Sequence, residues 1–455
     1  MDDLRVLLVT FPAQGFINPS LQLAKRLAAM GLTVTFVTAA SALNRMAKAT
    51  ATPTTGLTFA PFSDTDLDLD GDLETYVTEL RRPGSEAVAE IITSVAGSGQ
   101  PFNLVVYTFL LPWVGQIAGS LNLPSIFLWV QPAALFGLYY HYLNGYGDAI
   151  REIISDPSLF VDLPGLPRLH NRDLPSFILA SNVNSSPGPQ LREHLDVVAT
   201  ERNPKILVNS FDALEPEALR VIENINLVAV GPLIPSAFLD GKDPSDTSFG
   251  GDLFQNKFEN CMEWLNSKPK ESVVYVSFGS IVVLSDKQKE ELAGGLLESR
   301  RPFLWVMRGS EKGEKLSRKE ELEEHGMMVP WCSQVEVLQH PSLGCFVSHC
   351  GWNSAVESLV SGVPVVGFPQ SYDQATNAKL VEDVWMTGKT VGKKEEGVAE
   401  SGEIKRCIEM VMEGEEMRRN AKKWKDLAKE AAIEGGSSDL NLKAFVAHVK
   451  AEIRG

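Results

Sequence analysis

The residues most suited to chemistry lie between Gly344 and Ser361, where a strand, a tight turn and a helix follow one another. The apolar strand GCFVSH ends at His349, the turn CGWNS follows, and Asn353 and Ser354 stand where the next helix begins. Because the first amides of a helix point outward and the helix dipole is positive there, this end favours an anion such as a diphosphate. His349 could donate to a phosphate oxygen, and the Glu357 carboxylate could accept from the two hydroxyls of a ribose.

The run from Trp331 to Gln374 resembles, without a gap, the C-terminal signature box of plant family 1 UDP-glycosyltransferases. The resemblance extends to FPAQG near the N-terminus, to VSFGS at 276–280 and to DQATNAKL at 373–380. These phrases are most similar to the branch of anthocyanin 5-O-glucosyltransferase-like and glucose-ester-forming enzymes. The resemblance implies an enzyme that uses UDP-glucose as a donor substrate, needs no other cofactor and transfers the sugar, with inversion, to a small plant metabolite.

The resemblance also assigns a part of UDP-glucose to individual positions. Trp331 is assigned the stacking contact to uracil, and the backbone of Cys332 is assigned a contact to the base. Gln334 and Glu357 are assigned contacts to the ribose. Contacts to the two phosphates are assigned to Ser280, His349, Asn353 and Ser354. Contacts to the sugar, glucose more often than galactose, are assigned to Trp352, Asp373 and Gln374. No metal ion is implied at any of these positions.

One residue that the reaction needs is missing. An acceptor hydroxyl that attacks the anomeric carbon must lose its proton, so it needs a general base. In the family this base is a histidine in a phrase like FPAQGHINP, whereas the phrase here is FPAQGFINP and Phe16 holds the position. The aspartate that usually supports the histidine is replaced by Thr108, as is frequent in this branch. At the sugar end of the box, Ser371 stands where a tryptophan is usual and Tyr372 replaces a small residue.

Three explanations of Phe16 are open. The chain could be a slow variant, made or selected, that holds donor and acceptor together. The acceptor could be a carboxylic acid, which is ionised at neutral pH and needs no base. The fold could instead be repurposed or catalytically silent, binding a UDP-sugar or another small molecule without transfer. His141 and His170 also lie in the N-terminal half, but neither follows a strand end as Phe16 does, so we do not expect them to replace the base.

Short β-branched runs alternate with amphipathic helical patterns along the chain, which indicates βαβ units and parallel sheets. The first strand is expected at Arg5–Thr10, followed by a turn, and the first helix is expected to open at Asn18-Pro19 because proline suits a first turn. A chain of 455 residues is about twice the size that one hydrophobic core sustains. We therefore expect an α/β protein with two Rossmann-like, doubly wound domains.

The expected acceptor-binding domain covers residues 1–240, and the expected UDP-sugar-binding domain covers 257–436. Between them, residues 241–256 are rich in Gly, Pro, Asp and Ser, which is typical of an exposed linker. The resemblance adds the GT-B arrangement, in which a cleft separates the two domains. It also implies that a last helix within 437–455 packs back on the first domain.

Composition excludes several other kinds of protein. With 42 basic and 58 acidic side chains, the formal charge is −16, and no dense basic stripe offers a nucleic-acid surface. Polar residues, glycines and prolines interrupt the most apolar stretch, 104–140, before it reaches the length of a membrane span. Five cysteines without a CxxC pair suit a reduced cytoplasm and no zinc site. We expect a cytoplasmic monomer whose partners are UDP-sugar and a small-molecule acceptor.

Overall fold

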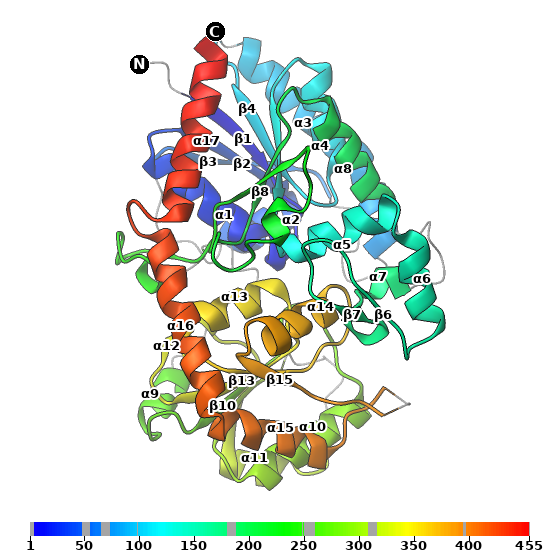
Figure 1. Cartoon of the computed structure of the whole chain (residues 1–455). Coiled ribbons are helices and arrows are strands. Elements are labelled where there is room, and N and C mark those ends of the chain that lie inside the picture. Colours follow the sequence, from blue (N-terminus) through cyan, green and yellow to red (C-terminus); the bar gives the residue numbers. More distant parts are fainter. Residues whose placement is uncertain are drawn as a thin grey trace. The chain divides into compact units, whose positions relative to one another are not determined.

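The structure is a computed structural model that describes residues 4–47, 55–64, 73–97, 99–179, 188–247, 249, 260–307, 316–394 and 397–454 (Figure 1). The chain divides into two compact units. Unit 1 contains Met1–Asn171, Phe177–Gln255 and Glu430–Gly455. Unit 2 contains Arg172–Ser176 and Asn256–Lys429. The domain limits expected from the sequence stay predictions.

Unit 1 is built on a parallel sheet of seven described strands, in the order β3-β2-β1-β4-β5-β8-β9. In chain order, the strands are β1 (Arg5–Val9), β2 (Thr33–Ala39), β3 (Leu57–Phe62), β4 (Leu104–Thr108), β5 (Ser125–Trp129), β8 (Lys205–Val208) and β9 (Asn226–Ala229). The strand order reverses between β1 and β4, as in doubly wound folds. A separate hairpin pairs β6 (Phe160–Val161) with β7 (Leu169–His170).

Helices cover both faces of this sheet. The described helices of unit 1 are α1 (Gln14–Ala29), α2 (Ala40–Ala47), α3 (Leu73–Gly97), α4 (Pro112–Ser120), α5 (Ala133–Leu143), α6 (Gly147–Ser155), α7 (Ser176–Leu179, whose first residue belongs to unit 2), α8 (Gly188–Thr200) and α17 (Ser437–Arg454). One buried cluster joins α1, α2 and α17 to alternate residues of the strands, such as Val106. The next residue, Tyr107, points to the opposite face and stacks on His194 of α8.

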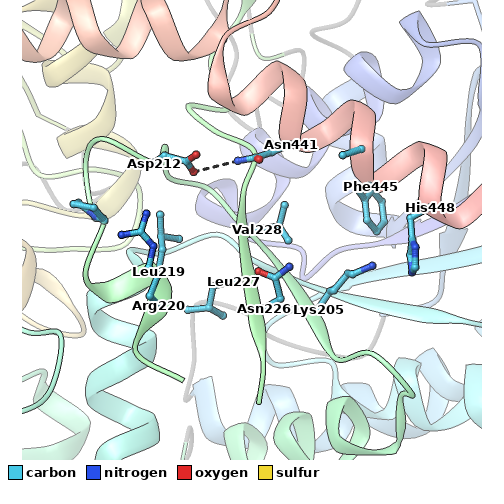
Figure 2. A pocket seen from close by; sticks show the side chains of 12 residues that line it. Lys205, Asp212, Leu219, Arg220, Asn226, Leu227, Val228, Asn441, Phe445 and His448 are labelled. Carbon is cyan, nitrogen blue, oxygen red and sulfur yellow. Dashed lines mark hydrogen bonds between the residues drawn. The ribbon is translucent and has the colours of Figure 1, made fainter. Parts of the chain in front are cut away.

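The last helix, α17, therefore packs on unit 1 through Leu442, Phe445, Val446 and Val449. Beside it, Asn441 donates one hydrogen bond to Asp212 (3.1 Å) and one to the Ala229 carbonyl of the edge strand β9 (3.0 Å). A pocket of about 490 Å³ lies between this helix and β9, and Figure 2 shows the side chains that line it. None of its lining residues is a site residue expected from the sequence.

Unit 2 is a parallel sheet of six described strands with helices on both faces. In sheet order, the strands are β12 (Gly326–Val329), β11 (Phe303–Val306), β10 (Val273–Ser277), β13 (Leu343–Ser348), β14 (Val365–Gly367) and β15 (Gly388–Thr390). The helices are α9 (Asn260–Asn266), α10 (Asp286–Ser299), α11 (Lys319–His325), α12 (Gln334–Gln339), α13 (Trp352–Ser361), α14 (Gln374–Lys379), α15 (Ser401–Glu413) and α16 (Glu415–Ala432), which extends into unit 1. Two buried clusters, one on each face of the sheet, confirm the expected doubly wound α/β class.

One local expectation was wrong. The first helix begins at Gln14, before Pro19, because the carbonyl of Ala13 accepts the amides of Phe16 (2.9 Å) and Ile17 (3.0 Å). The described front of the expected linker, 241–247, is mostly exposed, and its Asp246 pairs with Lys25 of α1 at 2.7 Å, so the linker stays a prediction. Residues 248 and 250–256 of that linker lie outside the described residues. Over the described ranges, no helix is both long and apolar enough to cross a membrane.

Candidate functional site

The candidate anion site lies where β13 turns into α13. Cys350 takes the left-handed conformation (φ 61°), and its amide donates to the Ser348 hydroxyl at 3.0 Å. Gly351 is the N-cap of α13, so the helix has no side-chain cap at its start. The first turn contains Asn353, partly exposed, and Ser354, buried, as the sequence predicts. This geometry suits a bound phosphate because a helix N-terminus presents amides and a positive dipole end.

The His349 imidazole is held between two glycines. A methyl group added at Gly279 would lie 2.7 Å from its Cε1 and Nε2 atoms, and one added at Gly351 would lie 2.5 Å from Nε2. Gly279 also has a positive φ of 71°, which favours glycine. The loop after β10, which carries Ser280, and the start of α13 thus both lie against one imidazole. The structure therefore places this loop, His349 and the first turn of α13 close together, and the phosphate assignment stays a prediction.

A second group of predicted residues is joined by Gln334 at the start of α12. Its side-chain amide donates to the Ser354 hydroxyl at 2.8 Å and to the Glu357 carboxylate at 2.5 Å. Its carbonyl accepts from the Tyr275 hydroxyl at 3.3 Å. Glu357 is 4% exposed, so this amide orients a buried carboxylate. Gln334 thus contacts the first two turns of α13 through Ser354 and Glu357.

The two residues that precede α12 differ in exposure. Trp331 is partly exposed in the loop after β12, where its ring could stack on a planar ligand. Cys332 is buried and lies 3.5 Å from the Tyr275 hydroxyl. Burial raises the pKa of the Cys332 thiol to about 12, so the thiol is neutral and does not act as a nucleophile.

The loop at the end of the box holds its polar side chains in fixed directions. The Gln374 carbonyl accepts the backbone amides of Gln370 (2.8 Å) and Ser371 (3.0 Å), which directs its side-chain NH₂ group away from those amides. Asp373 accepts from the Asn377 side chain at 2.9 Å, and the same amide donates to the Cys350 carbonyl at 2.9 Å. The sugar-end loop and the anion turn are therefore connected through Asn377.

The side chain of Trp352, a predicted sugar contact, is part of the core. The Trp352 indole is 3% exposed and packs against Trp385 with ring centroids 5.9 Å apart. A direct contact to a ligand would have to use its backbone amide in the first turn of α13, because the ring lies in the core.

In unit 1, Phe16 and Thr108 both contact Phe11. Phe16 is the third residue of α1, and its ring meets that of Phe11 edge-on at 5.4 Å. The Thr108 hydroxyl accepts the Phe11 amide at 3.0 Å and lies 3.5 Å from the Thr10 hydroxyl. Thr108 is fully buried, so its hydroxyl stabilises the strand end. Neither side chain can accept a proton from a substrate.

His141 and His170, the two other histidines weighed as a base, have the following contacts in the structure. His141 is 5% exposed, and its Nε2 donates to the Pro164 carbonyl at 3.0 Å, since a carbonyl can only accept. Its ring meets Tyr146 edge-on at 5.0 Å. His170 lies in the β6–β7 hairpin, with its ring 6.1 Å from that of Phe160.

Several residues that shape this site were missed in the sequence. Tyr275, Gly279 and Asn377 act by contacts between segments that are far apart in the chain. Tyr275 stands in a buried strand and is expected there as a core residue. The phrase VSFGS contains Gly279, but only the contact with His349 explains why glycine is needed.

Comparison with known proteins extends over nearly the whole chain. A family model described as UDP-glucoronosyl and UDP-glucosyl transferase matches residues 249–437. The crocetin glucosyltransferase, chloroplastic, of Gardenia jasminoides is 55% identical over 459 residues, which cover 97% of this chain and 96% of that protein. The anthocyanidin 3-O-glucoside 5-O-glucosyltransferase of Verbena hybrida is 50% identical over 463 residues, or 99% of each chain. The crystal structure of Os79 from O. sativa in complex with UDP has a TM-score of 0.86 at 35% identity, covering 98% of this chain and 100% of that one.

Proposed function

Since this chain belongs to the plant family 1 UDP-glycosyltransferases, we propose that it transfers glucose from UDP-glucose to acceptors that are already ionised, foremost carboxylic acids. That it is a UDP-sugar-dependent enzyme acting on small plant metabolites follows from its relatives. The restriction to ionised acceptors rests on Phe16, which stands where the base is expected and packs against Phe11.

The donor would bind entirely within unit 2. We assign the diphosphate to the start of α13, where His349, Asn353, Ser354 and Ser280 come together. We assign the ribose to Gln334 and Glu357, and the uracil to Trp331 and the backbone of Cys332. The glucose is assigned to Asp373, Gln374 and the backbone of Trp352. The hydrogen bonds from Gln334 to Ser354 and Glu357 support this assignment, because they orient the Ser354 hydroxyl and the Glu357 carboxylate before any ligand binds.

The proposed reaction needs no general base. A carboxylate oxygen attacks the anomeric carbon of UDP-glucose, the bond from that carbon to the phosphate oxygen breaks, and UDP leaves with the electron pair. The product is a glucose ester of inverted configuration, and no proton is transferred from the acceptor. The positive end of the α13 dipole and the His349 imidazole would stabilise the charge that develops on the leaving diphosphate.

Product analysis tests this function. Each aromatic skeleton is supplied with UDP-glucose in two forms, as a carboxylic acid and as the corresponding phenol or alcohol. We expect glucose esters from the acids and glucosides at a rate lower by about 10²-fold or more, because a positioned base contributes that much to hydroxyl attack. The ester rate is expected to be flat from about pH 6 to 9, since the acceptor is ionised throughout that range. Equal rates for both forms would contradict the restriction to ionised acceptors.

A glycine substitution tests the phosphate assignment. Gly279→Ala places a methyl group against the His349 ring and is expected to raise the Kd for UDP on the order of tenfold or more, because a charge-assisted hydrogen bond to phosphate is weakened. Calorimetry measures the change. Gly397→Ala is the matched control, since Gly397 has a similar positive φ of 75° but no atom within 4 Å of an added methyl group. Equal effects of the two substitutions would mean that backbone strain, and not His349, is responsible.

The compartment and the oligomeric state stay predictions. We propose a cytoplasmic monomer. The reduced compartment is supported by five cysteines that are all buried and form no disulfide among themselves. The name of the Gardenia relative places that protein in the chloroplast.

A further inference from the structure

Five residues from the first half of the chain, Arg172–Ser176, fold with unit 2, although the residues on either side belong to unit 1. Their partner is the loop that ends the predicted box. The Ser176 amide donates to the Tyr372 carbonyl at 2.8 Å, and the Tyr372 amide donates to the Ser176 hydroxyl at 2.9 Å. Both backbone groups of Tyr372 are therefore bound by one serine.

Tyr372 needs such support. Its φ of 59° lies in the left-handed region, which a residue with a Cβ adopts at a cost in free energy. Tyr372 is 43% exposed, so burial contributes little to holding it in place. The two hydrogen bonds to Ser176 are thus the described contacts that favour this conformation of the backbone.

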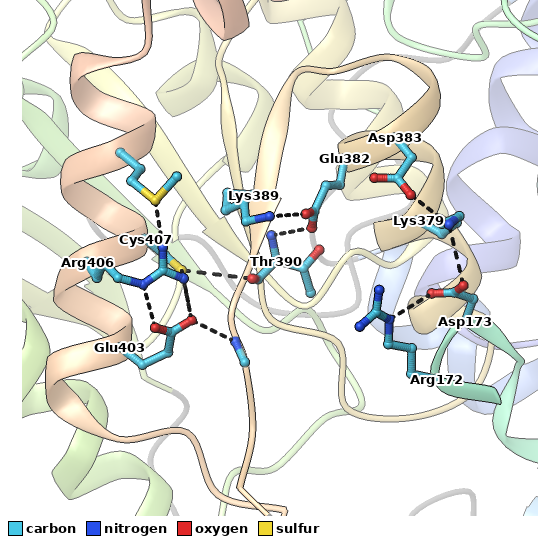
Figure 3. A network of polar contacts seen from close by, with 12 residues as sticks. Arg172, Asp173, Lys379, Glu382, Asp383, Lys389, Thr390, Glu403, Arg406 and Cys407 are labelled. Carbon is cyan, nitrogen blue, oxygen red and sulfur yellow. Dashed lines mark hydrogen bonds and ion pairs between the residues drawn. The ribbon is translucent and has the colours of Figure 1, made fainter. Parts of the chain in front are cut away.

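A second, buried contact lies one helical turn further on. The Thr376 hydroxyl donates to the Asp173 carbonyl at 2.7 Å, and Thr376 is 3% exposed. The Asp173 carboxylate also pairs with Lys379 of α14 at 3.5 Å, and both side chains are about a tenth exposed (Figure 3). The segment therefore holds α14 at two successive levels, as well as the loop before it.

Between these two contacts lie the residues assigned to the sugar, Asp373 and Gln374. Since the turn at Tyr372 and the helix position at Thr376 are both bound from outside, the directions of the side chains between them are fixed. We propose that Ser176 and Asp173 are positioning residues for the sugar of the donor. They hold the loop 370–374 in the conformation that directs the Gln374 NH₂ group and the Asp373 carboxylate to the glucose hydroxyls.

This inference rests on the proposed function, because it takes the assignment of the sugar to Asp373 and Gln374 from it. Its consequence is specific. UDP lacks the sugar and does not depend on this loop, whereas UDP-glucose does. Loss of the contacts should therefore weaken the binding of UDP-glucose and leave the binding of UDP unchanged. A general loss of folding would weaken the binding of both ligands alike.

The test uses Ser176→Ala, which removes the acceptor for the Tyr372 amide, and Thr376→Val, which removes a hydroxyl at nearly constant volume. Calorimetry with UDP and with UDP-glucose is expected to show Kd for UDP-glucose raised about threefold by Ser176→Ala and about tenfold by Thr376→Val, the more buried contact. Kd for UDP is expected to stay within a factor of two. The KM for UDP-glucose should rise with little change in kcat.

Two further variants make the result decisive. Ser176→Thr keeps an acceptor hydroxyl and is expected to bind UDP-glucose like the wild type. Ser299→Ala removes a hydroxyl of unit 2 that donates to the Leu296 carbonyl of its own helix (2.7 Å) and accepts the amide of Arg301 just after that helix (3.3 Å), and it is expected to change the Kd of neither ligand. Unchanged UDP-glucose binding in Ser176→Ala and Thr376→Val, or an equal loss of both ligands, would overturn the positioning role. If the wild type binds UDP but not UDP-glucose, the proposed function fails and the positioning role fails with it.

Discussion

Replacing Phe16 with histidine is expected to raise kcat/KM for phenol and alcohol acceptors by about 100-fold, at the lower end of the 10²–10⁴ that one positioned base contributes. The rate of ester formation from carboxylic acids should change little, because those acceptors have no proton to lose. The ratio of glucoside to ester, measured on mixed acceptors, therefore changes by about the same factor.

The local structure suits such a substitution. Phe16 is the third residue of α1 and is only partly buried, so an imidazole of similar size can occupy the place of its ring beside Phe11. The positive end of the helix dipole disfavours a charge on an imidazole at this position, which keeps it in the neutral form that accepts a proton. The expected gain is at the lower end because Thr108, at the position of the usual aspartate, is bound to the Phe11 amide and supplies no carboxylate to orient the new ring.

The matched control is Phe16→Leu, which also removes the phenyl ring but supplies no base. A gain in glucoside formation with His and not with Leu identifies proton acceptance as the cause. If both variants gain equally, the ring of Phe16 obstructs the acceptor. If neither gains, the position is not that of the base, and the family's assignment does not transfer to this chain.

The sequence was sufficient for the parts of the site that are local. The turn from His349 to Ser354 and the loop with Asp373 and Gln374 each follow a strand in one continuous stretch, so their residue types carry the signal. The alternation of strands and helices likewise predicted both sheets.

The sequence was insufficient where distant segments meet. The contacts of Gly279 with His349 and of Ser176 with Tyr372 join segments that are distant in the sequence, and their proximity follows from the tertiary structure alone. The start of α1 was misplaced for a related reason. The preference of proline for a first turn is a local rule, and it is overridden here by the Ala13 carbonyl, which begins the helix before Pro19.

Replacing His194 with phenylalanine is expected to make the protein more resistant to acid. His194 of α8 is fully buried, and neither ring nitrogen has a hydrogen-bond partner among the described residues. Its ring stacks on Phe127 at 4.2 Å and 9° and on Tyr107 at 5.6 Å and 10°. Burial lowers the pKa of His194 to about 3 from an ordinary value of 6.5. The folded protein therefore keeps this imidazole neutral at pH values at which the unfolded chain protonates it.

The sign of the effect follows from this difference. Above pH 6.5 both states are neutral at this residue and stability is unaffected, whereas between pH 6.5 and 3 the unfolded state alone binds the proton and becomes favoured. At pH 5 the loss amounts to about 2 kcal/mol, which corresponds to about 4–8 °C in the unfolding temperature of a unit of this size. His194→Phe should remove that part of the difference in unfolding temperature between pH 7.5 and pH 5.

His141→Phe is the informative comparison because His141 is equally buried but donates to the Pro164 carbonyl. Its replacement leaves a buried carbonyl without that donor, which is expected to lower the free energy of unfolding by about 1–3 kcal/mol. The unfolding temperature at pH 7.5 is therefore expected to fall. His194→Phe removes two unbonded nitrogens from an aromatic stack and is expected to raise it or leave it unchanged. Calorimetric scans of the two variants at both pH values separate these outcomes. If the difference in unfolding temperature between pH 7.5 and pH 5 is as large in His194→Phe as in the wild type, the His194 nitrogens are solvated in the folded state.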